Sequence, residues 1–205
     1  MSEIAPSELL AATRLPARSF YARPTVEVAR SLLGATLLHR TNDGLLAGVI
    51  VEVEAYLGQD DPAAHSSAGR TARTRVIFGG PGHAYVYKIY GLHHCLNVVA
   101  EPAGTPGCVL IRALEPVCGI AAMRSRRVAA RRADQIASGP AKLTQAMGIG
   151  MEAYGADLLG EPLCIRLPHK EPQVEVGTAK RIGIRKAREL DLRFFIADNE
   201  HVSRR

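Results

Sequence analysis

Two carboxylates and a phenol alternate along one short segment of this chain. Glu52, Glu54 and Tyr56 are separated by Val53 and Ala55, and such strict alternation predicts a β-strand. Side chains alternate between the two faces of a strand, so the three polar groups share one face. Carboxylates can activate water and stabilise positive charge, which makes this face a candidate chemical site. A solvent-facing strand edge is the alternative interpretation.

A second predicted strand carries a cluster of tyrosines. Tyr85, Tyr87 and Tyr90 fall within six residues of a chain that has six tyrosines and no tryptophan. Tyr85 and Tyr87 share a strand face, and their rigid π-surfaces suit stacking against a planar ligand. The simple preference of tyrosine for strands is the alternative explanation. Tyr90 precedes Gly91 at the strand end, so we expect its side chain to project from a tight turn.

The charge balance favours a nucleic-acid partner. The formal net charge is +6, the isoelectric point is about 9.4, and arginine greatly outnumbers lysine. Arginine pairs with phosphate through a planar fork. The arginines gather in two groups. In the second group, Arg124, Arg127 and Arg131 are expected to share one helical face that contacts phosphate. A helix face that is merely solvated is the alternative. These groups are Arg70, Arg73 and Arg75, and Arg124, Arg126, Arg127, Arg131 and Arg132.

Length and composition predict one cytoplasmic domain. The 205 residues show no linker, repeat or composition shift, so residues 16–205 are expected to form a single domain after a flexible N-terminal extension, residues 1–15. We expect no membrane span and no secretion signal. The four cysteines have no paired metal-ligand spacing, which favours reduced, buried thiols and no metal site.

The pattern of elements predicts an α+β fold. We expect a single mixed domain with a curved, mainly antiparallel β-sheet surrounded by helices. Helices are expected after Thr25, from Pro116 through Met123, and from Pro140 to Met147. A long loop spans residues 58–82, and loops of that length are commonly functional. Strands are expected at 36–39, 46–56, 85–90, 95–99, 108–114, 163–167, 181–184 and 192–196.

Several blocks of sequence, taken together and in this order, resemble the alkyladenine (3-methyladenine) DNA glycosylase family. The similarity extends over residues 30–196. It implies a monofunctional enzyme that flips damaged purines out of double-stranded DNA and hydrolyses the N-glycosidic bond, initiating base excision repair. It also implies a monomer without metal or organic cofactor, associated with the nucleoid in a bacterium. The blocks are EVEAYLG at 52–58, AAHS at 63–66, PG at 81–82, YVY at 85–87, YG at 90–91 with Asn97, LIRALEP at 110–116, and SGP at 138–140.

The resemblance also implies residue roles. Glu54 corresponds to the carboxylate that activates water, with Arg112 as its partner on a neighbouring strand. Tyr56 and Tyr87 correspond to the two walls that sandwich the flipped base, and His65 to a third wall that also forms hydrogen bonds. Asn97 corresponds to the pocket residue that disfavours the exocyclic amine of guanine.

The DNA contacts implied by the resemblance are less sharply defined. Tyr90 corresponds to the wedge that fills the gap left in the duplex, and Leu92 is the candidate second residue beside it. Lys88 is expected to face away from the pocket, which disfavours a Schiff-base step. The candidate phosphate contacts are Arg70, Arg73, Arg75 and Arg124.

Two further expectations concern the glutamates, and two alternative functions stay open. Arg112 should lower the pKa of Glu54, and Glu52 should have a structural role. A non-catalytic protein that binds damaged DNA could keep the aromatic pocket without needing the Glu54 carboxylate. An RNA-binding module could use the tyrosines to stack on splayed bases.

Overall fold

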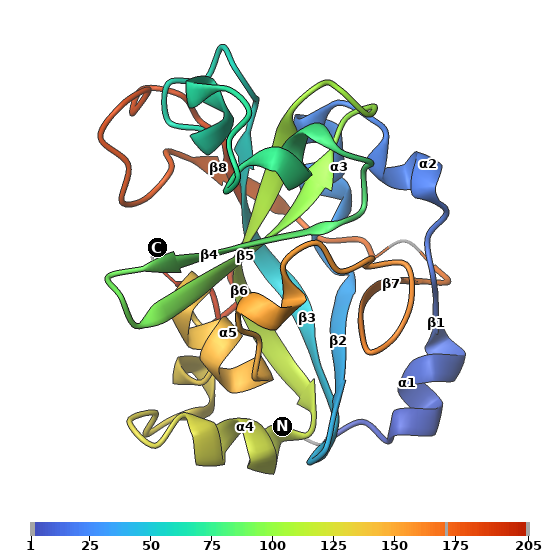
Figure 1. Cartoon of the computed structure of the whole chain (residues 1–205). Helices are drawn as coiled ribbons and strands as arrows, with labels where there is room; N and C mark the ends of the chain where they lie inside the picture. The colour runs from blue at the N-terminus through green and yellow to red at the C-terminus, as the bar shows by residue number, and fades with distance from the viewer. Residues whose placement is uncertain (1–2, 171, 204–205) are drawn as a thin grey trace.

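A nine-stranded sheet forms the centre of the molecule (Figure 1). The computed structural model describes residues 3–170 and 172–203 of the chain. The strands are β1 Thr13–Arg14, β2 Thr36–Thr41, β3 Gly44–Tyr56, β4 Ala84–Ile89, β5 His93–Ala100, β6 Gly107–Cys118, β7 Leu163–Pro168, β8 Val176–Ala179 and β9 Arg193–Ile196. The helices are α1 Pro6–Ala12, α2 Arg18–Tyr21, α3 Thr25–Ser31, α4 Ile120–Arg126 and α5 Pro140–Met147, with short 3₁₀ turns at His65–Ala68, Arg75–Phe78, Ala133–Gln135 and Met151–Ala153.

Strand β3 is the spine of this sheet. Residues 47–56 of β3 pair with β6, while the other edge of β3 pairs first with β2 and then, at residues 52–54, with β9. The main path runs β1-β7-β2-β3-β6-β5-β4, and the described strand pairs are antiparallel. The α+β fold class with a mainly antiparallel sheet is therefore confirmed.

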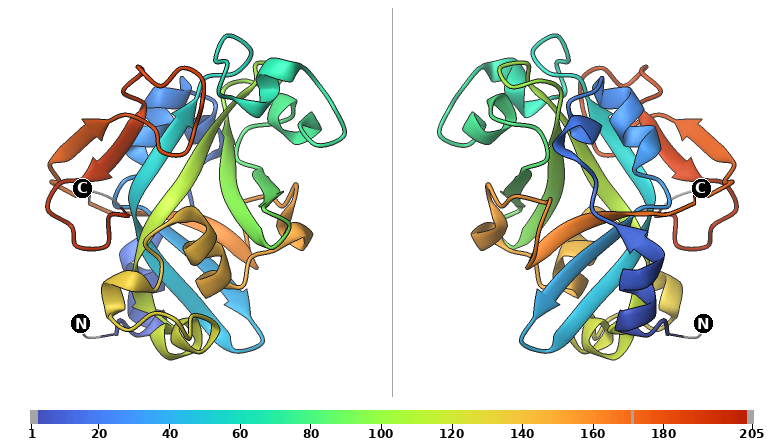
Figure 2. Two further views of the ribbon diagram at one scale, coloured as in Figure 1. Left: turned by 90° about the vertical axis from the view of Figure 1, so that its left-hand side faces the viewer. Right: turned by 90° about the vertical axis from the view of Figure 1, so that its right-hand side faces the viewer.

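Helices cover the sheet towards opposite ends of the molecule. Helix α3 packs on β3 and β6, and α5 packs on β5 and β6, while the side views show the strong twist of the sheet between them (Figure 2). Helix α5 begins at Pro140 and ends before Gly148, whose φ of 66° suits a left-handed helix cap. It buries Leu143 and Met147 in the main core. The predicted helix from Pro140 to Met147 is confirmed.

Three local predictions are wrong. Strand β6 continues through Pro116 to Cys118, and the helix begins only at Ile120. Pro116 pairs with Gly48 beside a register shift, a place in a strand where proline is tolerated. Gly119, with a φ of 72°, then turns the chain into α4. Because α4 ends at Arg126, the second arginine group does not share one helical face. The strand expected at 181–184 is irregular chain instead.

The N-terminal segment lies against the sheet from Pro6 onward. Leu9 on α1 is 5 % exposed and packs in a small cluster with Leu38 and Leu45, and β1 pairs with β7. The flexibility expected of residues 1–15 and the domain boundary at residue 16 stay predictions.

Two further sequence expectations concern membranes and cysteines. In the described part of the chain, no helix combines the length and the apolar character needed to cross a bilayer. The cysteines at 95, 108, 118 and 164 are all buried and unpaired.

We predict that Leu9→Ala lowers the free energy of unfolding by about 2–3 kcal/mol, because it leaves a cavity in a packed cluster. Denaturant unfolding measures the change. Leu15→Ala, at a side chain that is 41 % exposed, is the matched control and should change it by less than about 0.5 kcal/mol. Equal effects of the two substitutions would mean that α1 does not hold to the sheet in solution.

Candidate active site

A cavity of about 650 Å³ opens where β3, β4, β5 and β6 meet two irregular segments. One segment belongs to the 58–82 loop and the other is residues 182–186. Four lining side chains are cationic. The lining residues are Tyr56, Pro62, Ala63, His65, Arg73, Tyr85, Tyr87, Ile89, Tyr90, Cys95, Asn97, Cys108, Leu110, Arg112, Pro140, Ile182, Gly183, Ile184, Arg185 and Lys186.

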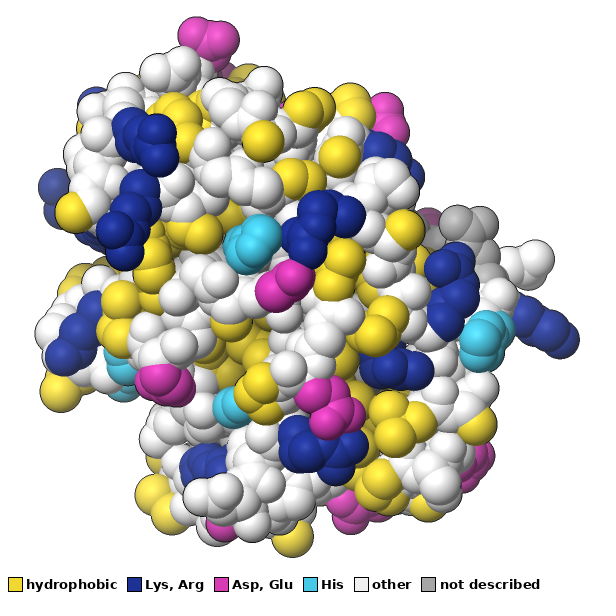
Figure 3. Space-filling model, turned by 45° about the vertical axis from the view of Figure 1, so that its right-hand side comes forward, with side chains coloured by type: hydrophobic (Ala, Val, Ile, Leu, Met, Phe, Trp, Pro, Cys, Tyr) yellow, Lys and Arg dark blue, Asp and Glu magenta, His cyan; other side chains and the backbone are white. Residues whose placement is uncertain are grey.

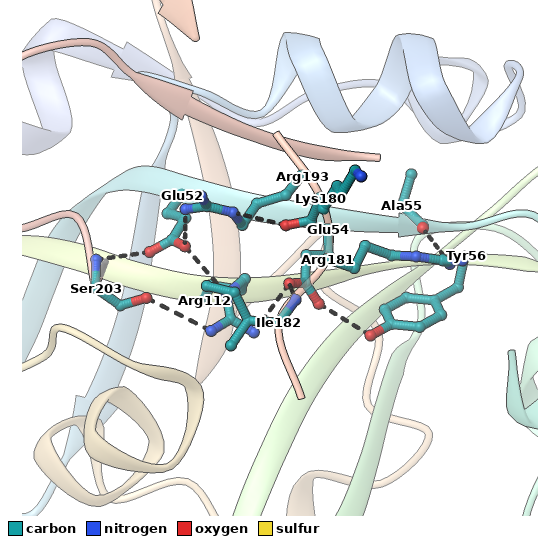
Figure 4. Close-up of polar contacts among 10 residues, drawn as sticks. All are labelled: Glu52, Glu54, Ala55, Tyr56, Arg112, Lys180, Arg181, Ile182, Arg193 and Ser203. Carbon is teal, nitrogen blue, oxygen red and sulfur yellow. Dashed lines mark hydrogen bonds and ion pairs between the residues drawn. The ribbon is translucent and has the colours of Figure 1, made fainter. Parts of the chain in front are cut away.

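The Glu54 carboxylate lies directly behind this lining and is fully buried. Its Oε1 accepts a hydrogen bond of 2.7 Å from the Ile182 backbone N–H and lies 3.1 Å from Arg112 Nη1. Its Oε2 accepts a hydrogen bond of 2.9 Å from the Tyr56 hydroxyl (Figure 4). All three partners line the cavity, so Glu54 is separated from the cavity only by the groups that hold it.

A bulge brings Arg112 to the two glutamates. In the β3–β6 pairing, Glu52 is opposite Ala113 and Val53 is opposite Ile111, so Arg112 is an extra residue on β6. A bulge re-aims a side chain and increases the local twist. Arg112 thereby reaches Glu52 as well as Glu54. The regular alternation of β6 alone would not predict contacts with both glutamates.

Burial decides the pKa of Glu54. Removal from water raises the pKa of this carboxyl, and it outweighs the lowering by Arg112, the Ile182 N–H and the Tyr56 hydroxyl, so the pKa lies above the ordinary 4.5. Arg112 lowers the pKa as expected, but the net shift is upward because the carboxyl is more deeply buried than the sequence could indicate. Burial also raises the pKa of Tyr56, which keeps its phenol protonated as a donor to Glu54.

Glu52 has a different environment from Glu54. It accepts hydrogen bonds from Arg112 Nε at 3.1 Å, from Arg193 Nη1 at 3.0 Å and from the Ser203 N–H at 2.8 Å. These donors come from β6, β9 and the C-terminal segment. Glu52 thus joins three parts of the chain, which supports the structural role expected of it.

Aromatic side chains form much of the cavity wall. Tyr56 comes from β3, Tyr85 and Tyr87 come from β4, and His65 begins a 3₁₀ turn in the long loop. The His65 ring meets the Tyr87 ring edge-on, with centroids 4.6 Å apart. Arg73 lies over Tyr87, its guanidinium carbon 5.1 Å from the ring centroid.

His65 is held in its neutral form. Arg73 can only donate, so the 3.4 Å contact between its Nη2 and His65 Nε2 makes Nε2 an acceptor, and Nδ1 donates to the Tyr85 hydroxyl at 2.8 Å. His65 is exposed as a whole residue, but partial removal of its ring from water, and then the charge of Arg73, lower its pKa to about 4. A neutral histidine offers hydrogen bonding near neutral pH, but it has no extra proton to give.

Asn97 is buried on β5 and lines the cavity. It is opposite Tyr85 on β4, and its Nδ2 donates to the Tyr85 carbonyl at 3.0 Å. Its Oδ1 has a long contact, 3.9 Å, with Cys108 Sγ. Neighbouring backbone therefore fixes the Asn97 amide in the cavity wall.

Tyr90 sits at the tip of the β4–β5 hairpin in an unfavourable backbone conformation. Its φ is 50° and that of Gly91 is 71°, while the Leu92 N–H donates to the Ile89 carbonyl at 3.2 Å. Positive φ at both central residues is typical of a type I′ turn, but it costs a tyrosine about 1–2 kcal/mol. Tyr90 is also 90 % exposed and Leu92 is 78 % exposed. A strained, exposed tyrosine beside a cavity indicates function.

One of the four candidate DNA-contacting arginines lines the cavity. Arg73 lines the cavity, whereas Arg70, Arg75 and Arg124 are exposed outside its lining. On the face shown in Figure 3, basic side chains are spread among acidic and hydrophobic ones. The phosphate contacts expected of these four residues stay predictions.

Sequence reasoning missed several residues of the site. The sequence places Tyr85 in the tyrosine cluster but predicts no role for it. The 182–186 segment lines one side of the cavity, and its signal in the sequence is the basic run KRIGIRKAR at 180–188. Among the described residues, no group of three or more His, Cys, Asp or Glu side chains is placed to hold a metal ion.

Comparison with known proteins gives one consistent result. The model of the family described as Methylpurine-DNA glycosylase (MPG) matches residues 19–200. A protein of Methanoculleus marisnigri is 51% identical over 194 residues, 93% of this chain and 99% of the relative. Proteins of Chlorobaculum parvum and Methanocella arvoryzae are 46% and 56% identical over 90% and 69% of this chain, and 88% and 70% of their own lengths. All three bear the name "Putative 3-methyladenine DNA glycosylase".

We predict that the His65 ring takes up its proton near pH 4 rather than near the ordinary 6.5, as followed by NMR. Arg73→Gln should raise this pKa while leaving it below 6.5, because burial is the larger cause. The folded state favours the neutral ring. The contribution of His65 to the free energy of unfolding is therefore complete above pH 6.5 and declines as the pH falls towards 4. Titration of the wild-type ring at 6.5 would contradict this environment.

We also predict that Glu52→Gln lowers the free energy of unfolding by about 3 kcal/mol, since it removes one member of a buried ionic cluster. Thermal and denaturant unfolding measure the loss. Glu161→Gln changes an exposed carboxylate paired with Arg40 and should cost less than about 1 kcal/mol. A similar small effect at both positions would remove the structural role from Glu52.

Proposed function

The chain belongs to the methylpurine-DNA glycosylase family, and we propose that it removes alkylated purines from double-stranded DNA by hydrolysing the bond between the base and its sugar. The observation that carries the proposal is the Glu54 carboxylate, held behind the cavity wall by three groups that themselves face the cavity. The products are the free base and an abasic site, and the enzyme acts as a monomer in the first step of base excision repair.

Glu54 is proposed to activate the attacking water. Water enters between the Tyr56 hydroxyl and Arg112, and Glu54 accepts one of its protons as the oxygen bonds to C1′ of the sugar. The glycosidic C–N bond breaks, and the base leaves with the electron pair. The sugar carries positive charge in the transition state, so an adjacent carboxylate stabilises it.

The aromatic wall suits a flipped purine. Tyr56, Tyr87 and His65 surround a cavity large enough for one base, and stacking on such rings contributes about 1–3 kcal/mol per base. Tyr90 is proposed to fill the gap that the flipped nucleotide leaves in the duplex. Its exposure and strained turn support this role, and the exposed Leu92 lies beside it.

The protonation of the site favours bases that already carry positive charge. Alkylation at N3 or N7 makes a purine a cationic and therefore good leaving group. Neutral lesions such as hypoxanthine and ethenoadenine need a proton before departure, and His65 has none to give near neutral pH. We therefore expect 3-methyladenine and 7-methylguanine to be released faster than the neutral lesions.

We predict that Glu54→Gln lowers the single-turnover rate of base release by about two to four powers of ten, because it removes the general base. Binding to a lesion-bearing duplex should be largely retained. The assay follows free base released from duplexes that each contain one defined lesion, with Glu161→Gln as an exposed control expected to match wild type.

Three results would contradict the proposal. Unchanged release by Glu54→Gln would remove the carboxylate from the reaction. Tight binding without release by the wild-type protein would indicate a non-catalytic DNA binder. Stronger binding to single-stranded RNA than to damaged duplex would indicate an RNA-binding module.

A further inference from the structure

A second buried ion pair lies behind the cavity and has no place in the chemistry described above. Arg181 and Asp61 have side chains that are 0% and 1% exposed. Arg181 Nη1 lies 2.5 Å from Asp61 Oδ2, and Nη2 lies 2.9 Å from Oδ1. This two-pronged arrangement fixes the guanidinium plane relative to the carboxylate. Burying both charges is costly unless the geometry is well satisfied, so the pair calls for an explanation.

Asp61 organises the first part of the long loop. Its two oxygens accept backbone hydrogen bonds from Leu57 at 3.2 Å and from Ala63 at 3.0 Å, and its carbonyl accepts one from Ala64 at 2.9 Å. The turn held in this way begins directly after Tyr56 and ends directly before His65. Asp61 thus sets the path of the chain between two residues of the cavity wall.

Arg181 connects that turn to β3 and to the segment that carries Ile182. Its Nη1 also donates to the Ala55 carbonyl at 3.0 Å, and its guanidinium carbon lies 4.7 Å from the centroid of the Tyr56 ring. The very next residue, Ile182, donates its N–H to Glu54 (Figure 4). One guanidinium therefore braces the Tyr56 ring and anchors the N–H that holds Glu54.

We propose that Arg181 and Asp61 form a positioning pair that holds the Ile182 N–H and the Tyr56 ring in register with Glu54, so that base release, more than DNA binding, depends on the pair. The inference rests on the proposed function for its kinetic consequence. Neither side chain reaches the cavity: the pair acts through Tyr56, Ile182 and Glu54. A displacement of about 1 Å in such a site can cost on the order of 100-fold in rate.

The alternative is a pair that only stabilises the fold. Removing one partner leaves an uncompensated buried charge, so single variants lose stability under both interpretations. A double variant, Asp61→Asn with Arg181→Met, separates them because it removes both charges and keeps side chains of similar length. It leaves no unpaired charge, but it has no donor for the Ala55 carbonyl and no cation against Tyr56.

The test combines kinetics with a direct view of the Ile182 amide. We expect the double variant to unfold close to the wild-type temperature and to bind lesion-bearing duplex with a dissociation constant within about threefold of wild type, whereas its single-turnover rate falls on the order of 100-fold. In ¹H–¹⁵N spectra, the Ile182 amide proton should move upfield and exchange faster as its bond to Glu54 loosens. Arg181→Lys keeps the charge but loses the two-pronged hydrogen bonding of the guanidinium. Its single-turnover rate should lie between those of wild type and the double variant.

Arg40→Met with Glu161→Gln is the matched control. This pair is also two-pronged, through Nε and Nη2 of Arg40 at 2.6 and 2.8 Å, but it is exposed and lies outside the cavity. Its rate and its Ile182 resonance should equal those of wild type.

Two outcomes separate this inference from the proposed function. A double variant that recovers both stability and wild-type base release would overturn the positioning role. A wild-type protein that releases no base would overturn the proposed function instead. The Ile182 amide would still report whether the pair positions Glu54. In that case, an unchanged Ile182 resonance in the double variant would overturn the inference.

Discussion

The structure depends on one buried contact, in which Arg112 lies between Glu52 and Glu54. Arg193 adds a second positive charge to Glu52, so two carboxylates and two guanidiniums balance in a nearly dry environment. Such a set is stable only when every member is paired. That requirement fixes the bulge in β6, the position of β9 against β3, and the position of the C-terminal segment at Ser203.

The same contact explains why two glutamates on one strand have different roles. Glu52 receives donors from three parts of the chain, and only one of them, Arg112, lines the cavity. Glu54 has donors that all line the cavity, so small movements of Tyr56 or of the Ile182 segment can admit water to it. Burial raises the pKa of Glu54, which makes this carboxylate a stronger base than an exposed one while Arg112 limits the shift.

The sequence predicted the parts of the site that follow from strand periodicity. Alternation places Glu54 and Tyr56 on one face of β3, and Tyr85 and Tyr87 on one face of β4. The helix from Pro140 follows from the proline at its start and the glycine after its end. The bulge at Arg112 could not be predicted because it depends on pairing between distant strands. The helix predicted at Pro116 failed for a related reason, since strand pairing with β3 continues past the proline. The Arg181–Asp61 pair joins residues 120 positions apart, and local pattern carries no signal for such a contact.

The most direct test of the account is an NMR titration of the Glu54 side-chain carboxyl alongside the pH dependence of single-turnover base release. We expect Glu54 to titrate above the ordinary value of 4.5 and the rate of release to fall as the pH is lowered through the same range, because only the carboxylate can accept the proton from water. A rate that stays constant while Glu54 becomes protonated would contradict the central claim.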